Sequence, residues 1–167
     1  MKHKTTKRST DLFVRELEPV QRDAESYKKI AHGEGLHTYA SFFEANTYDT
    51  ALERIQSAKK SINETMYGLF NKANRLVAVF LVHDTCVEGE PERQATVHYF
   101  VAESFQRRGY CVRGLEILAD MLCDVFDSFI FEIRKKNIAS IKVQESLGSV
   151  VEGEAKNFVF FKYLLAS

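Results

Sequence analysis

The sequence predicts an α/β protein of the α+β kind, with helices on both faces of a mixed, mostly antiparallel sheet of six to seven strands. In the second half of the chain, strand and helix patterns alternate, which indicates a central pair of parallel strands. In the first half, two strand patterns flank a tight turn, which indicates antiparallel pairing. The length of 167 residues suits one core, so we expect a single domain over residues 1–167.

The chain is expected to begin its ordered part with a strand and two helices. Leu12 and Val14, continued by Leu17, alternate with charged residues, as in a half-buried strand that Pro19 ends. A mostly polar helix should follow over residues 20–32, up to the glycines of "HGEG". The segment "HGEGLHTYASFFEANTY" is interpreted as flexible, with aromatic residues that either line a substrate pocket or fill a core or an interface.

The second helix has clearer boundaries in the sequence. Asp49 or Thr50 can cap it, and Leu52, Ile55 and Ile62 recur at helical spacing up to about residue 64. A hairpin should follow, with "TMYGLF" and "RLVAVFLVHD" as its strands and "NKAN" as its turn.

The remaining elements alternate between strand and helix. After the polar loop "VEGEPERQ", the strand "ATVHYFVAE" should lead into a helix over residues 109–124, then the strand "SFIFEIR" and a helix over residues 137–147 that Gly148 ends. The strands "SVVEGE" and "NFVFFKYLLA" should close the sheet. The apolar stripe of the first of these helices consists of Leu115, Leu118, Ala119 and Leu122.

Composition limits the classes of function. The formal net charge is zero, which argues against the broad basic surface of nucleic-acid-binding proteins. The three cysteines show neither disulfide nor zinc spacing, so we expect no metal and a reducing, cytoplasmic location. No apolar run is long enough to cross a bilayer. The basic tail over residues 1–9 is expected to be flexible and solvated, with RNA contact as the alternative.

The stretch "FQRRGYCVRGLEIL" points to an anion site. A strand that passes through a glycine-bearing turn into a helix directs unpaired backbone N–H groups at one point, and the helix macrodipole adds positive charge there. Gly109 permits a close approach of the backbone, and Arg107 and Arg108 add charge at the rim. We therefore expect a phosphate-bearing ligand at this turn.

Two motifs taken together resemble the GNAT acyltransferase superfamily. Gln106 through Cys111 resembles its acetyl-CoA motif, Gln/Arg-x-x-Gly-x-Gly/Ala, and "NIASIKVQESLGS" resembles its later Asn-x-x-Ser/Ala helix that ends in Gly-Phe. The start "LFVREL" is similar to the first strand of the branch typified by ribosomal-protein N-terminal acetyltransferases. The resemblance covers residues 96–151 well and the rest faintly.

The resemblance implies acetyl-CoA as co-substrate and a set of residues that bind it. The pantetheine arm should pair with main-chain groups of Phe100 and Val101, and the pyrophosphate should lie on the turn. Asn137 matches the family's side-chain contact to the cofactor, and Ser140 faces the same groove one helical turn on. The residues expected at the turn are Gln106, Arg107, Arg108, Gly109, Tyr110, Cys111 and Val112.

Several positions depart from the family's pattern. Cys111 replaces a Gly or Ala, Glu103 replaces a frequent Pro, and Ser149 stands where Phe is usual. Gln144 occupies the position of the Tyr that protonates the leaving thiolate in many members, so that role does not transfer. Gln144 and Cys111 motivate an alternative in which the chain binds CoA as a sensor or interaction module and catalyses nothing.

For acetyl transfer to an amine, His98 is the first candidate for the general base, because histidine titrates near neutrality and this one lies on the cofactor-bearing strand. Tyr99 falls on the opposite face by strand alternation, so we expect at most one of the pair to face the substrate. Other candidate bases are Glu132, Glu152 and Glu154, and Ser140 and Ser146 are candidate thiolate donors. Cys111 is expected to pack rather than to act as a nucleophile, because no base adjoins it.

The function implied by this resemblance is N-acetylation by direct attack of a primary amine on acetyl-CoA. The acceptor is left open among a protein N-terminus, an amino sugar and a small metabolite. Neither a membrane nor a nucleic acid is expected as a partner, and a homodimer is left open.

Overall fold

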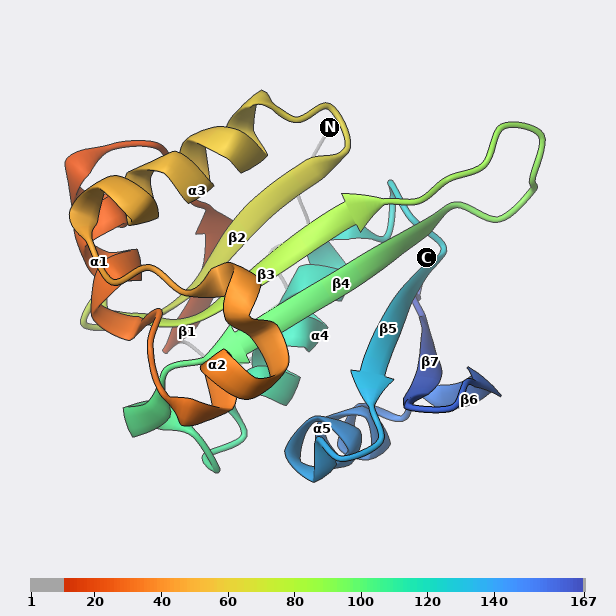
Figure 1. Cartoon of the computed structure of the whole chain (residues 1–167). Helices are drawn as coiled ribbons and strands as arrows, with labels where there is room; N and C mark the ends of the chain where they lie inside the picture. The colour runs from red at the N-terminus through yellow and green to blue at the C-terminus, as the bar shows by residue number, and fades with distance from the viewer. Residues whose placement is uncertain (1–10, 167) are drawn as a thin grey trace.

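A computed structural model describes residues 11–166, and the basic tail lies outside this part of the chain. Seven strands form one sheet in the order β1-β2-β3-β4-β5-β7-β6, and only β4 and β5 pair in parallel. The predicted mixed sheet with one central parallel pair is therefore confirmed (Figure 1). The strands are β1 (Leu12–Glu16), β2 (Glu64–Asn71), β3 (Leu76–Asp84), β4 (Gln94–Val101), β5 (Ser128–Arg134), β6 (Val150–Glu154) and β7 (Phe158–Leu164).

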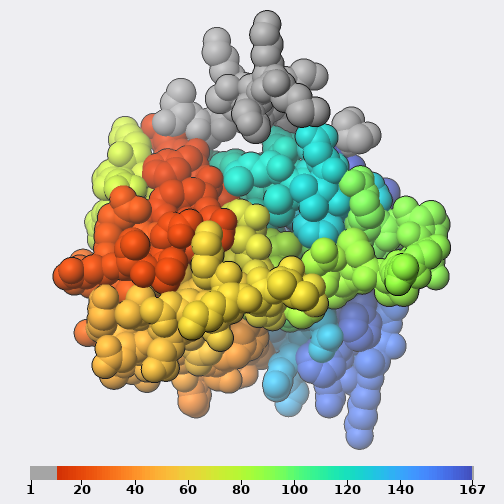
Figure 2. All heavy atoms as spheres, turned by 90° about the horizontal axis from the view of Figure 1, so that it is seen from above, coloured from red at the N-terminus to blue at the C-terminus, as the bar shows by residue number. Residues whose placement is uncertain are grey.

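The helices cover both faces of the sheet, as Figure 1 shows. Seen from above in Figure 2, α3 and the end of α4 lie on opposite sides of the strands. In the described chain, no helix is both long enough and apolar enough to cross a membrane. The helical elements are α1 (Gln21–Ile30), α2 (Glu34–Ala40), η1 (Ser41–Phe43), α3 (Tyr48–Lys60), η2 (Glu103–Phe105), α4 (Tyr110–Leu122) and α5 (Ile138–Leu147).

Each face of the sheet has its own apolar core. Beneath α4, Leu115 and Leu118 pack with Phe129 of β5, and all three are fully buried. Beneath α1 and α3, Tyr27 and Ile55 pack with Phe100 of β4. The predicted stripe on α4 is buried, as expected for an amphipathic helix that covers a sheet.

The segment expected to be flexible is partly helical, which corrects the sequence interpretation. It contains α2 and η1, and its Leu36 and Phe43 are buried in the second core. Gly33 precedes α2 with φ at 115°, a conformation that favours glycine. Gly33 of "HGEG" therefore marks the turn between two helices, and Gly35 lies in the first turn of α2.

The boundaries of α3 also differ from those expected. Its N-cap is Thr47, whose hydroxyl accepts a hydrogen bond from the Thr50 N–H at 3.1 Å, so neither Asp49 nor Thr50 is the cap. The helix ends at Lys60, and Ile62 is 96% exposed in the turn before β2. Ile62 matched the helical spacing by coincidence, because the chain turns toward the sheet before reaching it.

Candidate active site

The two parallel strands separate along their length. β4 pairs with β5 at only three positions, Gln94 with Ser128, Ala95 with Phe129 and Thr96 with Ile130. In the described chain, β4 makes no further pair with β5, although it stays paired with β3 as far as Val101. A gap therefore opens between β4 and β5 and widens from Thr96 toward the end of β4 (Figure 1).

The backbone of β4 presents free polar groups to this gap. The N–H of Ala102 donates to the carbonyl of Val77, so the even-numbered residues at this end of β4 direct their main-chain groups at β3. By alternation, the main-chain groups of Tyr99 and Val101 and the carbonyl of Val97 face the gap, whereas the Val97 N–H belongs to the last pair with β5, that of Thr96 with Ile130. Only the carbonyl of Val101 meets a described partner, the side-chain amide of Gln106 at 3.2 Å. A ligand in the gap can pair with the others as an added strand does.

Among the expected cofactor residues, Phe100 and Val101 thus have different surroundings. The main chain of Phe100 faces β3, and its ring lies in the second core against Phe43, with 5.0 Å between ring centroids. Val101 faces the gap and packs against the first core. The strand-like pairing predicted for both residues is available at Val101 only.

The turn after β4 gathers unpaired amides at the start of α4. Arg107 and Gly109 both adopt left-handed conformations, with φ of 60° and 74°. From Arg107 through Val112, no main-chain N–H donates to an acceptor among residues 11–166, and the first N–H that does is that of Arg113, which donates to the Gly109 carbonyl at 3.2 Å. Consecutive free amides of this kind form an anion-binding nest at the positive end of a helix macrodipole.

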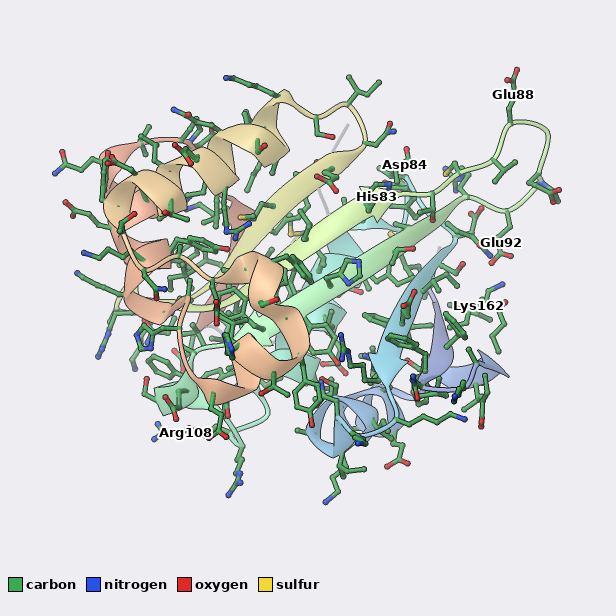
Figure 3. The ribbon with its side chains drawn as sticks, viewed as in Figure 1. His83, Asp84, Glu88, Glu92, Arg108 and Lys162 are labelled. Atoms are coloured by element: carbon green, nitrogen blue, oxygen red, sulfur yellow. The ribbon has the colours of Figure 1, made fainter. Side chains whose placement is uncertain are left out.

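The charged rim of the nest lies at one end of the sheet. Arg108 is exposed there, at the end remote from His83 and Asp84 (Figure 3). A Cβ added to Gly109 would meet no atom within 4 Å, so the turn is open on the side where a Gly109 side chain would lie. Tyr110 and Val112 pack their side chains against the first core and leave their amides at the nest.

The other expected motif starts α5 on the far side of the gap. The side-chain oxygen of Asn137 accepts a hydrogen bond from the Ser140 N–H at 3.2 Å, which makes Asn137 the N-cap of α5. Its NH₂ group is not needed for this cap and can donate to a ligand. Tyr39 of α2 closes the lower end of this region, since its hydroxyl donates to the Lys136 carbonyl at 3.2 Å.

A polar cluster inside the protein joins β4 to α5. Gln144 is fully buried, its NH₂ donates to the Tyr99 hydroxyl at 3.1 Å, and its carbonyl accepts from the Ser149 hydroxyl at 2.8 Å. Two of the departures from the family pattern therefore touch each other. The sequence contained both residues, but nothing local in it indicates that Tyr99 meets them.

The candidate base His98 lies on the opposite face of β4 from Tyr99. Its ring meets Phe42 of η1, whereas the Tyr99 ring packs against Phe131 in the other core. Burial lowers the pKa of His98, and the carboxylate of Glu132 on β5 partly offsets this. The imidazole is therefore neutral at neutral pH, which is the form that accepts a proton.

The remaining catalytic candidates are less favourably placed. Cys111 is buried in the first core, and burial raises the pKa of its thiol. Glu152 contacts Lys162 at 3.5 Å, and Glu154 pairs with Lys135 at 2.7 Å. Cys111 therefore has a packing role in the core. The carboxylates of Glu152 and Glu154 are engaged in ion pairs at the surface.

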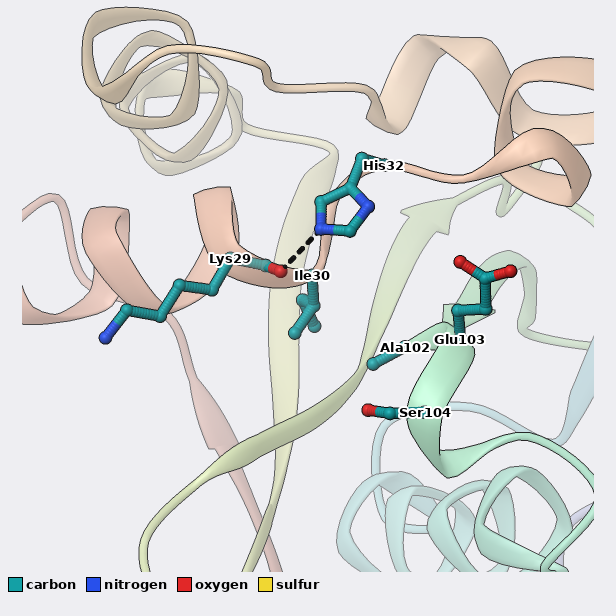
Figure 4. Close-up of a pocket in the computed structure, with 6 residues that line it drawn as sticks. All are labelled: Lys29, Ile30, His32, Ala102, Glu103 and Ser104. Carbon is teal, nitrogen blue, oxygen red and sulfur yellow. Dashed lines mark hydrogen bonds between the residues drawn. The ribbon is translucent and has the colours of Figure 1, made fainter.

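A pocket of about 370 Å³ opens beside the nest, between the end of α1 and η2 (Figure 4). Lys29, Ile30 and His32 line one side, and Ala102, Glu103 and Ser104 line the other. The imidazole of His32 hydrogen-bonds the Lys29 carbonyl at 2.8 Å. Glu103 also lies close to Gly33. Its carboxylate is 3.4 Å from the point where a Cβ of Gly33 would lie.

Solved structures that are similar to this chain include acetyltransferases. Neither a protein-family model nor a curated protein matches the sequence. Solved structures do match over almost the whole chain. An acetyltransferase of the GNAT family from Bacillus anthracis has a TM-score of 0.75 at 15% identity, over 94% of this chain and 96% of that one.

Two of the similar structures contain coenzyme A. A ribosomal L7/L12 alpha-N-protein acetyltransferase in complex with coenzyme A has a TM-score of 0.78 at 17% identity, over 94% of this chain and 96% of that one. Spermidine N-acetyltransferase from Vibrio cholerae, in complex with CoA and spermine, has a TM-score of 0.74 at 15% identity, over 94% and 97%. This chain therefore has the GNAT fold, as its motifs predicted, and the likeness includes ribosomal-protein acetyltransferases.

Proposed function

We propose that this protein is an acetyl-CoA-dependent N-acetyltransferase that acts on a primary amine. The observation that carries the proposal is the run of free amides from Arg107 through Val112, continuous with the free main-chain edge of β4. The nest suits a diphosphate, and the edge suits an amide-bearing arm that runs beside a strand. Acetyl-CoA has both groups in that order and supplies an acetyl thioester at the end of the arm.

The residues of the chain divide the task among them. The amides from Arg107 through Val112 bind the diphosphate, Gln106 holds the turn through the Val101 carbonyl, and Arg107 and Arg108 add charge. Asn137 donates its free NH₂ to the arm, and Ser140 faces the same side of the gap. The main-chain N–H of Tyr99 on β4 donates to the thioester oxygen as negative charge develops on it.

His98 accepts the proton of the attacking amine in this proposal. Its lowered pKa keeps the ring neutral, and its position beside Phe42 places it on the face that α2 and η1 border. Glu132 lies close enough to influence His98 and can attract an ammonium group before the amine loses its proton. The class of amine remains a protein N-terminus, an amino sugar or a small metabolite.

Mass spectrometry tests the proposal directly. The full chain is incubated with acetyl-CoA and a panel of amines that contains peptides with free N-termini, polyamines and amino sugars. For one class of acceptor, the expected product is about 42 Da heavier than the acceptor, because an acetyl group replaces one hydrogen of the amine. The same peptides with acetylated N-termini serve as the matched control, because they have no amine to attack.

Coenzyme A binding is tested separately by calorimetry. Arg108→Glu places a negative charge at the nest and should weaken binding about tenfold, the size of one charge-assisted hydrogen bond. Lys156→Glu makes the same charge change at an exposed position between β6 and β7 and should leave binding unchanged. Binding without any acetylated product would favour the sensor alternative, for which Gln144 in place of Tyr is the motivating observation.

A further inference from the structure

A chain of hydrogen bonds joins α5 to the part of β4 that borders the gap. It runs from the Ser149 hydroxyl to Gln144, from Gln144 to the Tyr99 hydroxyl, and from that hydroxyl to the Ser140 carbonyl. Gln144 has no exposed surface, and both ends of its amide are satisfied. An apolar side chain would fill this space without the cost of burying an amide, so the network indicates a requirement beyond packing.

In this network the Tyr99 hydroxyl can still donate its own hydrogen to a ligand. The Tyr99 oxygen accepts from Gln144 at 3.1 Å, so its own hydrogen must point elsewhere. The Ser140 carbonyl that receives it lies at 3.4 Å, which is long for a hydroxyl donor. A stronger acceptor that enters the gap can therefore take this hydrogen bond without breaking the contact with Gln144.

The next step rests on the proposed function. With the diphosphate on the nest, the arm runs back along β4 from Val101 toward Thr96, where pairing with β5 closes the gap. The thioester at its end must therefore stop beside Val97 to Tyr99. That stretch has His98 on the α2 face and Tyr99 on the α5 face.

We infer that the Tyr99 hydroxyl donates a hydrogen bond to the thioester sulfur and stabilises it as the thiolate leaves, with Gln144 as the positioning residue. In this step the C–N bond forms and the C–S bond breaks, with its electron pair passing to sulfur. The amine proton passes to His98, and the released thiolate of coenzyme A takes a proton from water. The donor thus comes from β4 and not from α5, where Gln144 stands.

This inference also revises the expectation that only one of His98 and Tyr99 faces the substrate. Both border the gap because the strands have separated, one residue from each face. His98 on the α2 face suits an amine that enters from that side. Tyr99 on the α5 face suits a sulfur that leaves toward α5.

The titratable surroundings keep the Tyr99 hydroxyl protonated. Burial raises its pKa, and hydrogen bonds with the side chains of Gln144 and Ser140 lower it only in part. The titratable group that faces it from α4 is Cys111, and burial raises the pKa of that thiol as well. Both groups are therefore neutral across the pH range in which a coenzyme thiol ionises.

Binding of coenzyme A compared with desulfo-coenzyme A tests the inference without an acceptor. Calorimetry is done at about pH 7 and about pH 9.5, on either side of about 8.5, the ordinary pKa of a cysteine thiol. If Tyr99 donates to the thiolate, the affinity of the full chain for coenzyme A relative to the desulfo form should rise about tenfold at the higher pH. Tyr99→Phe should abolish that rise, and Gln144→Met should reduce it by misplacing the hydroxyl.

Tyr67→Phe is the matched control, since Tyr67 is a partly buried tyrosine of β2 beside the same core, and it should keep the rise. A rise that survives Tyr99→Phe, or that is absent from the unmodified chain although coenzyme A binds, overturns the inference alone. Failure of the unmodified chain to bind either compound overturns the proposed function. Far-UV circular dichroism of each variant confirms that the fold is retained.

Discussion

The ring of Phe42 meets the imidazole of His98 edge to face, with 5.3 Å between the ring centroids and 80° between the ring planes. Phe42 lies in η1 and His98 on β4, so the contact joins the segment after α2 to the strand that borders the gap. Burial is the first cause of the lowered His98 pKa, and Phe42 provides part of that burial. The aromatic segment between the first two predicted helices is therefore part of the candidate site.

Phe42→Ala should raise the pKa of His98 toward its ordinary value of about 6.5, because water then reaches the ring and stabilises the imidazolium. An activity that needs neutral His98 falls as the pH is lowered and the ring becomes protonated. In the variant this fall should begin at a higher pH than in the unmodified protein. NMR titration of the His98 ring measures the shift. Phe13→Ala is the control, since Phe13 is 41% exposed and Phe42 is 43% exposed, and it should leave the His98 titration unchanged.

Asn137 has two functions that a pair of substitutions can separate. Asn137→Asp keeps the side-chain oxygen that caps α5 but removes the NH₂ donor, so stability should be unchanged while coenzyme A binding weakens about tenfold. Asn137→Ala removes both and should also cost about 1 kcal/mol of unfolding free energy. Urea denaturation and calorimetry give the two quantities, and equal binding by both variants and the unmodified chain would exclude Asn137 from the site.

Two glycines near α4 should respond differently to alanine. A Cβ at Gly114 would lie 2.6 Å from Cζ of Phe80 and 2.9 Å from Cδ2 of Leu69, so Gly114→Ala should destabilise the fold by about 1–3 kcal/mol. At Gly109 the space is open, and the cost of about 1–2 kcal/mol comes from its φ of 74°. Only Gly109→Ala should also weaken coenzyme A binding. Equal binding losses in the two variants, measured where both are folded, would contradict a ligand at the nest.

The buried carboxylate of Asp23 should make stability sensitive to acid. Burial by itself would raise its pKa, but hydrogen bonds from Arg15, the Glu18 N–H and Arg22 lower it to about 2. Because the folded pKa lies below the ordinary 3.8, the contribution of Asp23 to stability is complete above about pH 3.8 and is lost as the pH falls toward 2.

Asp23→Asn should therefore lower the unfolding free energy by about 3–5 kcal/mol near pH 7, since Arg15 loses its charged partner. The difference from the unmodified protein should shrink as the pH falls from 3.8 toward 2. Thermal unfolding across this pH range measures it. Glu53→Gln, an exposed change on α3, should change stability by less than about 0.5 kcal/mol, and a similar loss there would refute the role of Asp23.

Local patterns predicted the elements whose residues repeat with a clear period. The apolar stripe of α4 and the alternation in β1 were interpreted correctly, because burial on one face of a regular element imposes that period. The sequence interpretation missed α2, since its seven residues contain a glycine and only Leu36 is buried. It also placed Ile62 in α3, because spacing alone does not show where a helix ends.

Apart from α2 and η1, the sequence by itself determined the order of strands and helices, the glycine-bearing turn before α4 and the asparagine that begins α5, since each depends on residues close together in the chain. Only the tertiary structure decided that β4 and β5 separate after Thr96 and that Tyr99 reaches Gln144, 45 residues further on. The physical reason is that strand pairing and helix packing set the distances between remote residues, and these depend on the whole sheet. The sequence therefore shows which chemical group each residue carries, but only the folded sheet determines which other groups it contacts.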